Sequence, residues 1–228
     1  MAWYKKYLSI YNKPFDDVPR STISEIRERL QLLQSDQPLV SVVVIAYNEG
    51  QRLAACLWSL SELKTKYPIE ILGVNNSSSD NTEEVYKALG VRYFNETKKS
   101  PGFARQCGLD NSKGKYHFFI DADTFYPPLY VDTMMQTLIK PGVSCVGSFW
   151  SYYPDKHHSA LSLTCFEFVR DTFLWIKNPH RHPSRRGRLT RSLTQEIRSH
   201  SLRPQPEGTA CHRLRNSRQR LTHTKPYL

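Results

Sequence analysis

The run from Leu39 to Ala46 constrains the fold most, because it is apolar apart from Ser41 and consists mainly of the β-branched residues Val and Ile. Such a run is typical of a parallel strand that helices cover on both faces. Similar apolar runs recur at 69–74, 91–94, 116–120 and 143–150. Segments with helical spacing of apolar residues flank these runs, at 22–34, 50–63, 81–89, 102–110 and 128–139. The alternation predicts the α/β class, with a mostly parallel sheet and flanking helices.

The charge distribution divides the chain near residue 176. Residues 1–176 contain 19 basic and 19 acidic residues, whereas 177–228 contain 13 basic and only 2 acidic ones, so the whole net charge of +11 lies in the last segment. Apolar residues there fall to 10 of 52, too few to offset the entropy of ordering. We expect an N-terminal extension with one helix at 1–38, an α/β domain at 39–176, and a disordered basic tail at 177–228.

Three interpretations of this tail are open. It is an evolved arm that neutralises the phosphates of nucleic acid or of an anionic membrane surface, or a disordered linker, or the product of out-of-frame translation that truncates the domain. Hydrophobic periodicity ends abruptly there, and Arg replaces Lys, with 11 Arg and 2 Lys in the tail. That abruptness favours the out-of-frame interpretation.

Several function classes are disfavoured by what the sequence lacks. It has no apolar run of the roughly 20 residues that span a membrane, and its start has no continuous apolar segment of a signal peptide. Its five cysteines are scattered and form no CxxC pair, which favours a reducing compartment. We therefore expect a cytoplasmic protein, with peripheral contact at the inner face of the membrane as an open alternative.

Polar residues follow three of the predicted strands at the point where each strand ends. They are Tyr47 to Glu49, Asn75 to Asp80 and Asp121 to Asp123. Because the carboxyl ends of parallel strands meet at one edge, and ligands bind beyond that edge, these residues predict a single site.

Asp121 and Asp123 carry the strongest chemical signal. Residues two apart on an extended chain point the same way, about 6.6 Å apart. Two carboxylates so arranged suit a hard divalent ion, Mg²⁺ or Mn²⁺, that binds a diphosphate. The alternative is a pair of solvated loop acids.

Each of three further residues has both a binding and a plain structural interpretation. Tyr47 offers a ring that stacks on a nucleobase, or it simply packs at a strand end. Asn76 contacts a base or ribose, or it belongs to an ordinary polar turn. Arg105 opens a short helix and faces phosphates there, or it is a surface residue.

Four motifs in order resemble those of family 2 glycosyltransferases, which have the Rossmann-like GT-A fold. They are Val40–Glu49, Val74–Thr82, Gly102–Gly108 and Phe118–Asp123. The resemblance covers about half of the chain. It implies inverting transfer of a sugar from a nucleotide-diphosphate sugar to the hydroxyl group of a saccharide or lipid-linked acceptor, as in the assembly of cell-envelope polysaccharide. Specific nucleic-acid binding is not expected.

By position, the resemblance also implies roles for individual residues. Ala46, Tyr47 and Glu49 line the nucleoside pocket, and Asn76 faces the base. Arg105 meets the diphosphate. Asp121 lies on the ribose or sugar side, and Asp123 binds Mn²⁺ or Mg²⁺ together with Asp121.

The chain departs from the family pattern at two places. Asn75 and Asn76 stand where acidic residues are usual, so Asn76 brings hydrogen-bonding groups but no charge. The family's general base is an acid well beyond the Asp121 strand, where this chain has only Asp155, Glu167 and Asp171, none in a recognisable motif. We therefore assign no catalytic residue. A donor-binding half without activity, a compact active enzyme, and a protein that binds nucleic acid or an anionic surface through its tail are the three hypotheses.

Overall fold

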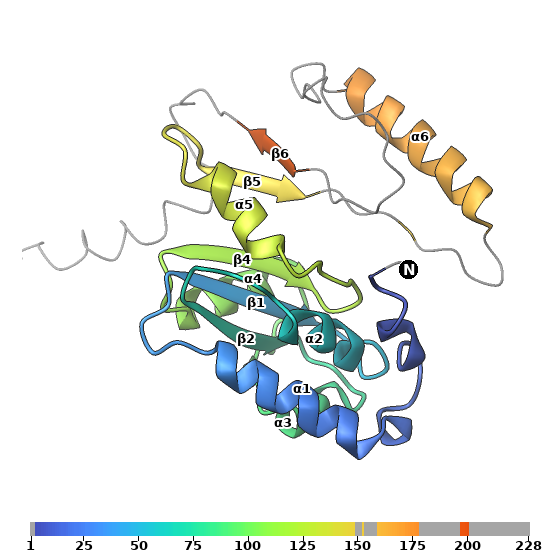
Figure 1. Ribbon diagram of the computed structural model, residues 1–228, viewed down its shortest axis with the longest axis vertical. Helices are drawn as coiled ribbons and strands as arrows, with labels where there is room; N and C mark the ends of the chain where they lie inside the picture. Colours follow the sequence, from blue (N-terminus) through green and yellow to red (C-terminus); the bar gives the residue numbers. More distant parts are fainter. Residues whose placement is uncertain (1–2, 149–151, 153–158, 178–196, 201–228) are drawn as a thin grey trace, which may run out of the picture. The chain divides into compact units, whose positions relative to one another are not determined.

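The computed structural model describes residues 3–148, 152, 159–177 and 197–200. Contacts divide the chain into two compact units, Met1–Asp132 and Thr133–Leu228. The first unit contains the sheet that carries the predicted site (Figure 1).

The sheet of the first unit is entirely parallel. Its four strands are β1 (Val40–Ala46), β2 (Ile69–Asn75), β3 (Arg92–Asn95) and β4 (Tyr116–Asp121), in the order β3-β2-β1-β4. Along the sequence, β2 and β3 are therefore added one after the other on one side of β1, and β4 is then added on the other side of β1. Ligands of such sheets bind where the order reverses, here between the carboxyl ends of β1 and β4.

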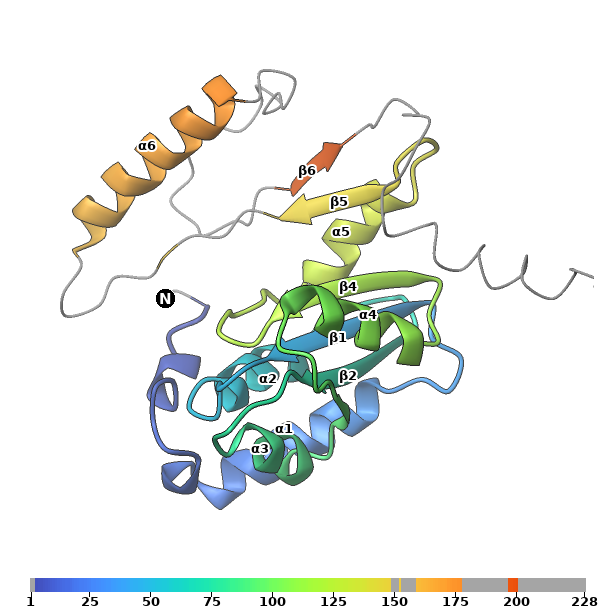
Figure 2. The same ribbon diagram turned by 180° about the vertical axis from the view of Figure 1, so that it is seen from behind.

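Helices cover both faces of this sheet. One face carries α1 (Arg20–Leu33), α2 (Leu53–Ser61) and α3 (Thr82–Ala88), while α4 (Pro101–Asn111) covers the other, as the views from the two sides show (Figures 1 and 2). Every residue of β2 and all but one of β1 are buried. The predicted α/β class, a parallel sheet with flanking helices, is confirmed.

The sheet edge opposite the predicted site is held by one buried carboxylate. Glu70 is 4% exposed, and its Oε1 accepts hydrogen bonds from Ser41 Oγ and from the Lys113 backbone N–H, both at 2.6 Å. Its Oε2 accepts from Arg92 Nη2 at 2.7 Å. Glu70 therefore ties together β1, β2, β3 and the segment that leads into β4.

The N-terminal segment is docked onto the first unit. It contains two short 3₁₀ turns, Tyr7–Ser9 and Phe15–Asp17, before α1 begins. Tyr7 is 1% exposed, and its ring lies 5.6 Å from that of Trp58 on α2. Its hydroxyl donates to Glu62 Oε2 at 2.9 Å. The single α-helix expected in this extension is present as α1.

The second unit corrects one expectation. The run at 143–150 forms only a short strand, β5 (Cys145–Ser148), which pairs antiparallel with β6 (Ile197–His200) in a separate two-stranded sheet. It is therefore not a fifth parallel strand, because local periodicity does not show which partner a strand pairs with. Of the segment predicted to be a disordered tail, 177–228, the structure describes only Lys177, at the end of α6, and β6.

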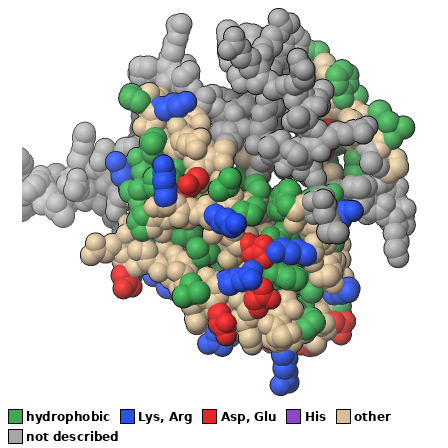
Figure 3. Space-filling model, viewed as in Figure 1, with side chains coloured by type: hydrophobic (Ala, Val, Ile, Leu, Met, Phe, Trp, Pro, Cys, Tyr) green, Lys and Arg blue, Asp and Glu red, His purple; other side chains and the backbone are tan. Residues whose placement is uncertain are grey.

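Two helices complete the description of the chain. They are α5 (Tyr130–Leu138), which crosses the boundary between the units, and α6 (Ala160–Lys177) in the second unit. Within the described residues, no helix combines the length and apolar character needed to cross a bilayer. Acidic and basic side chains are interspersed on the face drawn in Figure 3, as the balanced charge of residues 1–176 leads one to expect.

Replacing Glu70 with Gln should destabilise the protein by about 1–3 kcal/mol, because the charge that faces Arg92 and two other donors is lost. Urea unfolding measures this difference. The matched control is Glu84→Gln on the exposed side of α3, which should change stability by less than about 0.5 kcal/mol. Equal effects of the two variants would contradict the role given to Glu70.

Candidate functional site

The loops that follow β1 and β2 are joined by hydrogen bonds at the carboxyl edge of the sheet. Asn48 Oδ1 accepts from the Ser79 backbone N–H at 2.8 Å, and the Asn48 N–H donates to Ser78 Oγ at 3.0 Å. Asn48 has a φ of +54°, a left-handed conformation that Asn tolerates better than most residues. The side chain of Asn48 therefore reaches across to the second loop from a turn that few other residues would adopt.

Asp80 makes a second connection between these loops. Its Oδ2 accepts from the Gly50 N–H at 2.9 Å, and its Oδ1 accepts from the Thr82 hydroxyl at 2.5 Å. A side chain at Gly50 would collide with Asn81, since a Cβ there would lie 1.8 Å from Asn81 Oδ1. Burial raises the pKa of Asp80, but the hydrogen bonds from Thr82 and Gly50 outweigh it and hold that pKa below its ordinary value.

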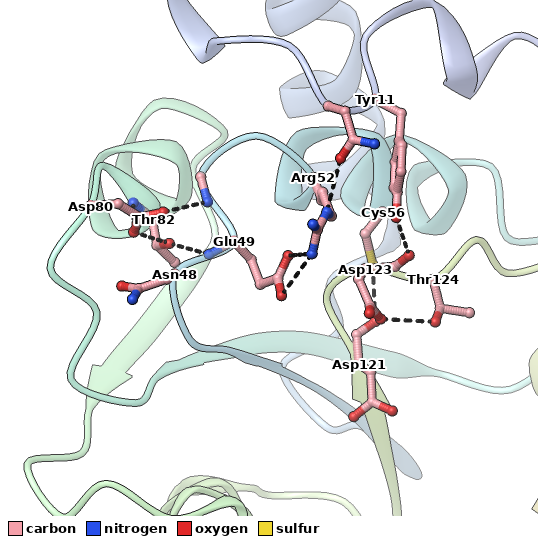
Figure 4. Close-up of polar contacts among 12 residues, drawn as sticks. Tyr11, Asn48, Glu49, Arg52, Cys56, Asp80, Thr82, Asp121, Asp123 and Thr124 are labelled. Atoms are coloured by element: carbon pink, nitrogen blue, oxygen red, sulfur yellow. Dashed lines mark hydrogen bonds and ion pairs between the residues drawn. The ribbon is translucent and has the colours of Figure 1, made fainter. Parts of the chain in front are cut away.

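A cavity of about 250 Å³ lies beside the joined loops. It is lined by Asn48, Glu49, Gln51, Arg52, Asp80 and Asn81, several of which Figure 4 labels. Arg52 Nη1 lies 3.1 Å from Glu49 Oε2 and forms an ion pair with it. Burial raises the pKa of Glu49, and the charges of Asp123 and Asp80 raise it further, against the opposing effect of Arg52. The cavity is therefore lined by polar side chains, and the negative charges of Asp80 and Asp123 act on Glu49.

Three predicted nucleoside-site residues lie at the ends of β1 and β2 with very different exposure. Tyr47 is 48% exposed, and Lys99 Nζ lies 5.7 Å from the centre of its ring. Ala46 is buried, and its carbonyl accepts from the Asn76 N–H at 2.9 Å. Asn76 is 4% exposed, and its Oδ1 has no hydrogen-bond partner among the described residues. Tyr47 thus presents a ring, while Ala46 contributes only backbone.

The two aspartates do not have the extended geometry expected from their spacing. Strand β4 ends at Asp121, and Ala122 and Asp123 lie in a turn. In Figure 4 the Asp121 carboxylate points away from Asp123. It is 72% exposed and lies 3.9 Å from Arg105 Nη2. The structure therefore brings Arg105 and Asp121 together and places Asp123 nearer to Glu49 and α2.

The backbone of this turn is held by side chains that the sequence analysis did not identify. The Tyr126 hydroxyl accepts from the Asp121 N–H at 3.0 Å and lies 3.3 Å from the Asp121 carbonyl oxygen. The Tyr11 hydroxyl donates to the Asp123 carbonyl oxygen at 3.0 Å (Figure 4). Thr124 Oγ1 donates to Asp123 Oδ1 at 3.1 Å. No sequence motif points to Tyr11 or Tyr126, although aromatic residues just after the two aspartates weakly indicate a contact with this turn.

The acidic groups at this edge suit a cation that is coordinated partly by the protein and partly by a bound ligand. The described residues contain no group of three or more His, Cys, Asp or Glu side chains that would hold a metal ion alone. Mg²⁺ is usually bound through one or two carboxylates together with substrate phosphates, and rarely by a cage of protein ligands. The Asp123 carboxylate is suited to that second kind of site, whereas the exposed Asp121 carboxylate points away from it.

The three acidic residues that are candidates for the general base, Asp155, Glu167 and Asp171, belong to the second unit. Glu167 Oε1 accepts from the Tyr152 N–H at 2.7 Å. Asp155 lies outside the described residues, and of Asp171 only the backbone in α6 is described. A catalytic base therefore stays unassigned.

Lowering the pH should weaken the connection that Asp80 makes between the two loops. Because the folded-state pKa of Asp80 is lowered, its ionised form stabilises the fold above about pH 4, and this contribution is lost as the pH falls through that lowered pKa. We expect the wild type to be more stable than Asp80→Asn at pH 7, with a difference that shrinks below pH 4. Thermal unfolding of both proteins across pH 2.5–7 measures it, and a difference that stays constant over this range would refute the assignment.

Curated relatives match the first part of the chain. Glycosyltransferase AglE of Haloferax volcanii is 29% identical over 122 residues, which cover 50% of this chain and 40% of AglE. The uncharacterized glycosyltransferase YibD of Escherichia coli is 32% identical over 105 residues, covering 43% and 30%. The chain thus spans less than half the length of these curated relatives.

Two solved structures are also similar to the chain. Glucosyl-3-phosphoglycerate synthase from Mycobacterium tuberculosis, in complex with Mg²⁺ and UDP, matches with a TM-score of 0.47 and 20% identity over 78% of this chain and 60% of that one. The mannosyltransferase PcManGT from Pyrobaculum calidifontis, in complex with GDP-Man and Mn²⁺, has a TM-score of 0.46 and 19% identity over 58% and 44%.

A family model matches most of the chain. The model of glycosyl transferase family 2 matches residues 41–196, which is more than half of the 228 residues. The match begins at β1, includes the loops after β1 and β2 and the Asp121 turn, and runs past the boundary expected at residue 176. The chain therefore belongs to glycosyl transferase family 2.

Proposed function

We propose that the carboxyl edge of the sheet binds a nucleotide-diphosphate sugar together with Mn²⁺ or Mg²⁺, and that the protein transfers the sugar to a hydroxyl acceptor. The observation that carries this proposal is the family match over residues 41–196, which contains every loop of the site. Its physical support is the position of those loops, because the loop after β1 and the turn after β4 flank the point where the strand order of the parallel sheet reverses, and the loop after β2 lies next to them.

The nucleoside would lie over the ends of β1 and β2. The half-exposed ring of Tyr47 offers a face on which a base stacks. The unpartnered Oδ1 of Asn76 is a buried acceptor, which supports a hydrogen bond from an N–H or O–H group of a ligand. Glu49 lines the neighbouring cavity, where a carboxylate accepts hydrogen bonds from ribose hydroxyl groups.

The diphosphate would lie between α4 and the turn after β4. Arg105 is about half exposed and lies 3.9 Å from Asp121, so its guanidinium is available to phosphate oxygens. Asp123 would hold the cation, and Asp121 would lie on the ribose or sugar side, because its carboxylate points away from Asp123. When bound, that cation neutralises charge on the nucleoside-diphosphate leaving group.

The acceptor and the cellular setting are the broader part of the proposal. The family resemblance supports a saccharide or lipid-linked acceptor, cell-envelope polysaccharide assembly, and a cytoplasmic site of action at or near the inner face of the membrane. The competing hypothesis of nucleic-acid or anionic-surface binding depends on residues 177–228, of which only Lys177 and β6 are described, and no described feature favours it.

Donor binding should depend on both the cation and Asp123. We expect UDP or GDP to bind in the presence of Mn²⁺ or Mg²⁺ and at least tenfold more weakly in its absence, because the cation offsets repulsion between phosphates and carboxylates. Asp123→Ala should weaken binding by a similar factor, while Asp36→Ala, at an exposed turn outside the site, should not change it. Isothermal titration calorimetry measures these affinities, and cation-independent binding would overturn the metal role.

A further inference from the structure

The segment that precedes the family match reaches into the candidate site. The match begins at residue 41, yet Tyr11 and Asn12 contact both the Asp123 turn and the loop of Glu49 and Arg52. We propose that residues 3–18 form a strap that positions the donor site, with Tyr11 as a positioning residue for Asp123 and Asn12 as one for Arg52. This inference rests on the proposed function only for its effect on nucleotide binding.

Tyr11 supports the turn that carries Asp123. Its hydroxyl donates to the Asp123 carbonyl oxygen at 3.0 Å, and its ring lies 5.1 Å from that of Phe125 in an edge-to-face arrangement. Because β4 ends at Asp121, the backbone of Asp123 is no longer held by the strand ladder. The conformation of this turn decides where the Asp123 carboxylate points, so the Tyr11 hydrogen bond constrains that carboxylate.

Asn12 contacts the segment that follows β1. It has a φ of +58°, and its N–H donates to the Gln51 carbonyl oxygen at 3.0 Å. Its Oδ1 accepts from Arg52 Nε at 2.9 Å, while Arg52 Nη1 pairs with Glu49 (Figure 4). Two consecutive residues of the strap therefore contact the turn after β4 and the loop after β1, which flank the reversal of strand order.

The anchor of the strap makes its own hydrogen bonds, although Tyr7 shares the ring contact with Phe125. Tyr7 is fully buried against Trp58 and Phe125, and its hydroxyl donates to Glu62. Lys6 also forms an ion pair with Glu62. Ile10 and Val18 are each 5% exposed. Removing one hydroxyl from Tyr11 therefore leaves the docking of the segment intact.

The test compares two variants that each remove one hydroxyl from the strap. Tyr11→Phe loses the bond to Asp123 and keeps the ring contact with Phe125, whereas Tyr7→Phe loses the bond to Glu62 away from the site. In hydrogen exchange on the ligand-free protein, Tyr11→Phe should speed exchange of the amides at 122–126, and Tyr7→Phe should not. Unchanged exchange in Tyr11→Phe, or the same increase in both variants, overturns the positioning role.

A second readout measures the consequence for the ligand. Tyr11→Phe should weaken Mn²⁺-dependent UDP or GDP binding by about three- to tenfold, as expected for loss of one hydrogen bond, while Tyr7→Phe should bind like the wild type. Asn12→Gly, which keeps the positive φ but removes the contact with Arg52, should also weaken binding. If the wild type binds neither nucleotide, the proposed function fails, and hydrogen exchange still decides whether the strap positions the turn. Wild-type affinity in both Tyr11→Phe and Asn12→Gly overturns the inference.

Discussion

The central position of β1, paired in parallel with β2 on one side and β4 on the other, is the constraint on which the rest of the structure depends. It brings the carboxyl end of β1 beside Asp121, although Ala46 and Asp121 lie far apart in the sequence. In register, Ile45 stands opposite Asp121, and Ala46 stands opposite Asn75. The groups proposed to meet a base and a diphosphate are adjacent for this reason.

The two edges of the sheet solve different physical problems. At the amino edge, Glu70 is buried and fully hydrogen-bonded, which stabilises the sheet and leaves no group for a ligand. At the carboxyl edge, the loops are held by their backbones through Asn48, Asp80 and Tyr126, while the carboxylate of Asp121 stays exposed. Fixed backbones with an exposed acidic group are what a site needs if a charged ligand is to complete it.

The four parallel strands follow the sequence prediction to within one residue at each end, because strands buried on both faces leave a strong local pattern. The site was predicted from polar residues at strand ends for the same reason. The turn at Ala122 and the bond from Tyr11 to Asp123 were not predictable in this way, since that bond joins residues 112 positions apart. The pairing of β5 with β6 was missed because neither composition nor periodicity encodes a distant partner.

The most direct test of a nucleotide site at the carboxyl edge is an NMR titration of the ¹⁵N-labelled protein with UDP and, separately, GDP, each with Mg²⁺. The account predicts that amide shifts change together at 46–52, 75–82 and 121–126 and at Arg105. It also predicts no change around Ser41, Glu70 and Gly114 at the opposite edge. Shift changes at that opposite edge, or none at the carboxyl edge with either nucleotide, would contradict it.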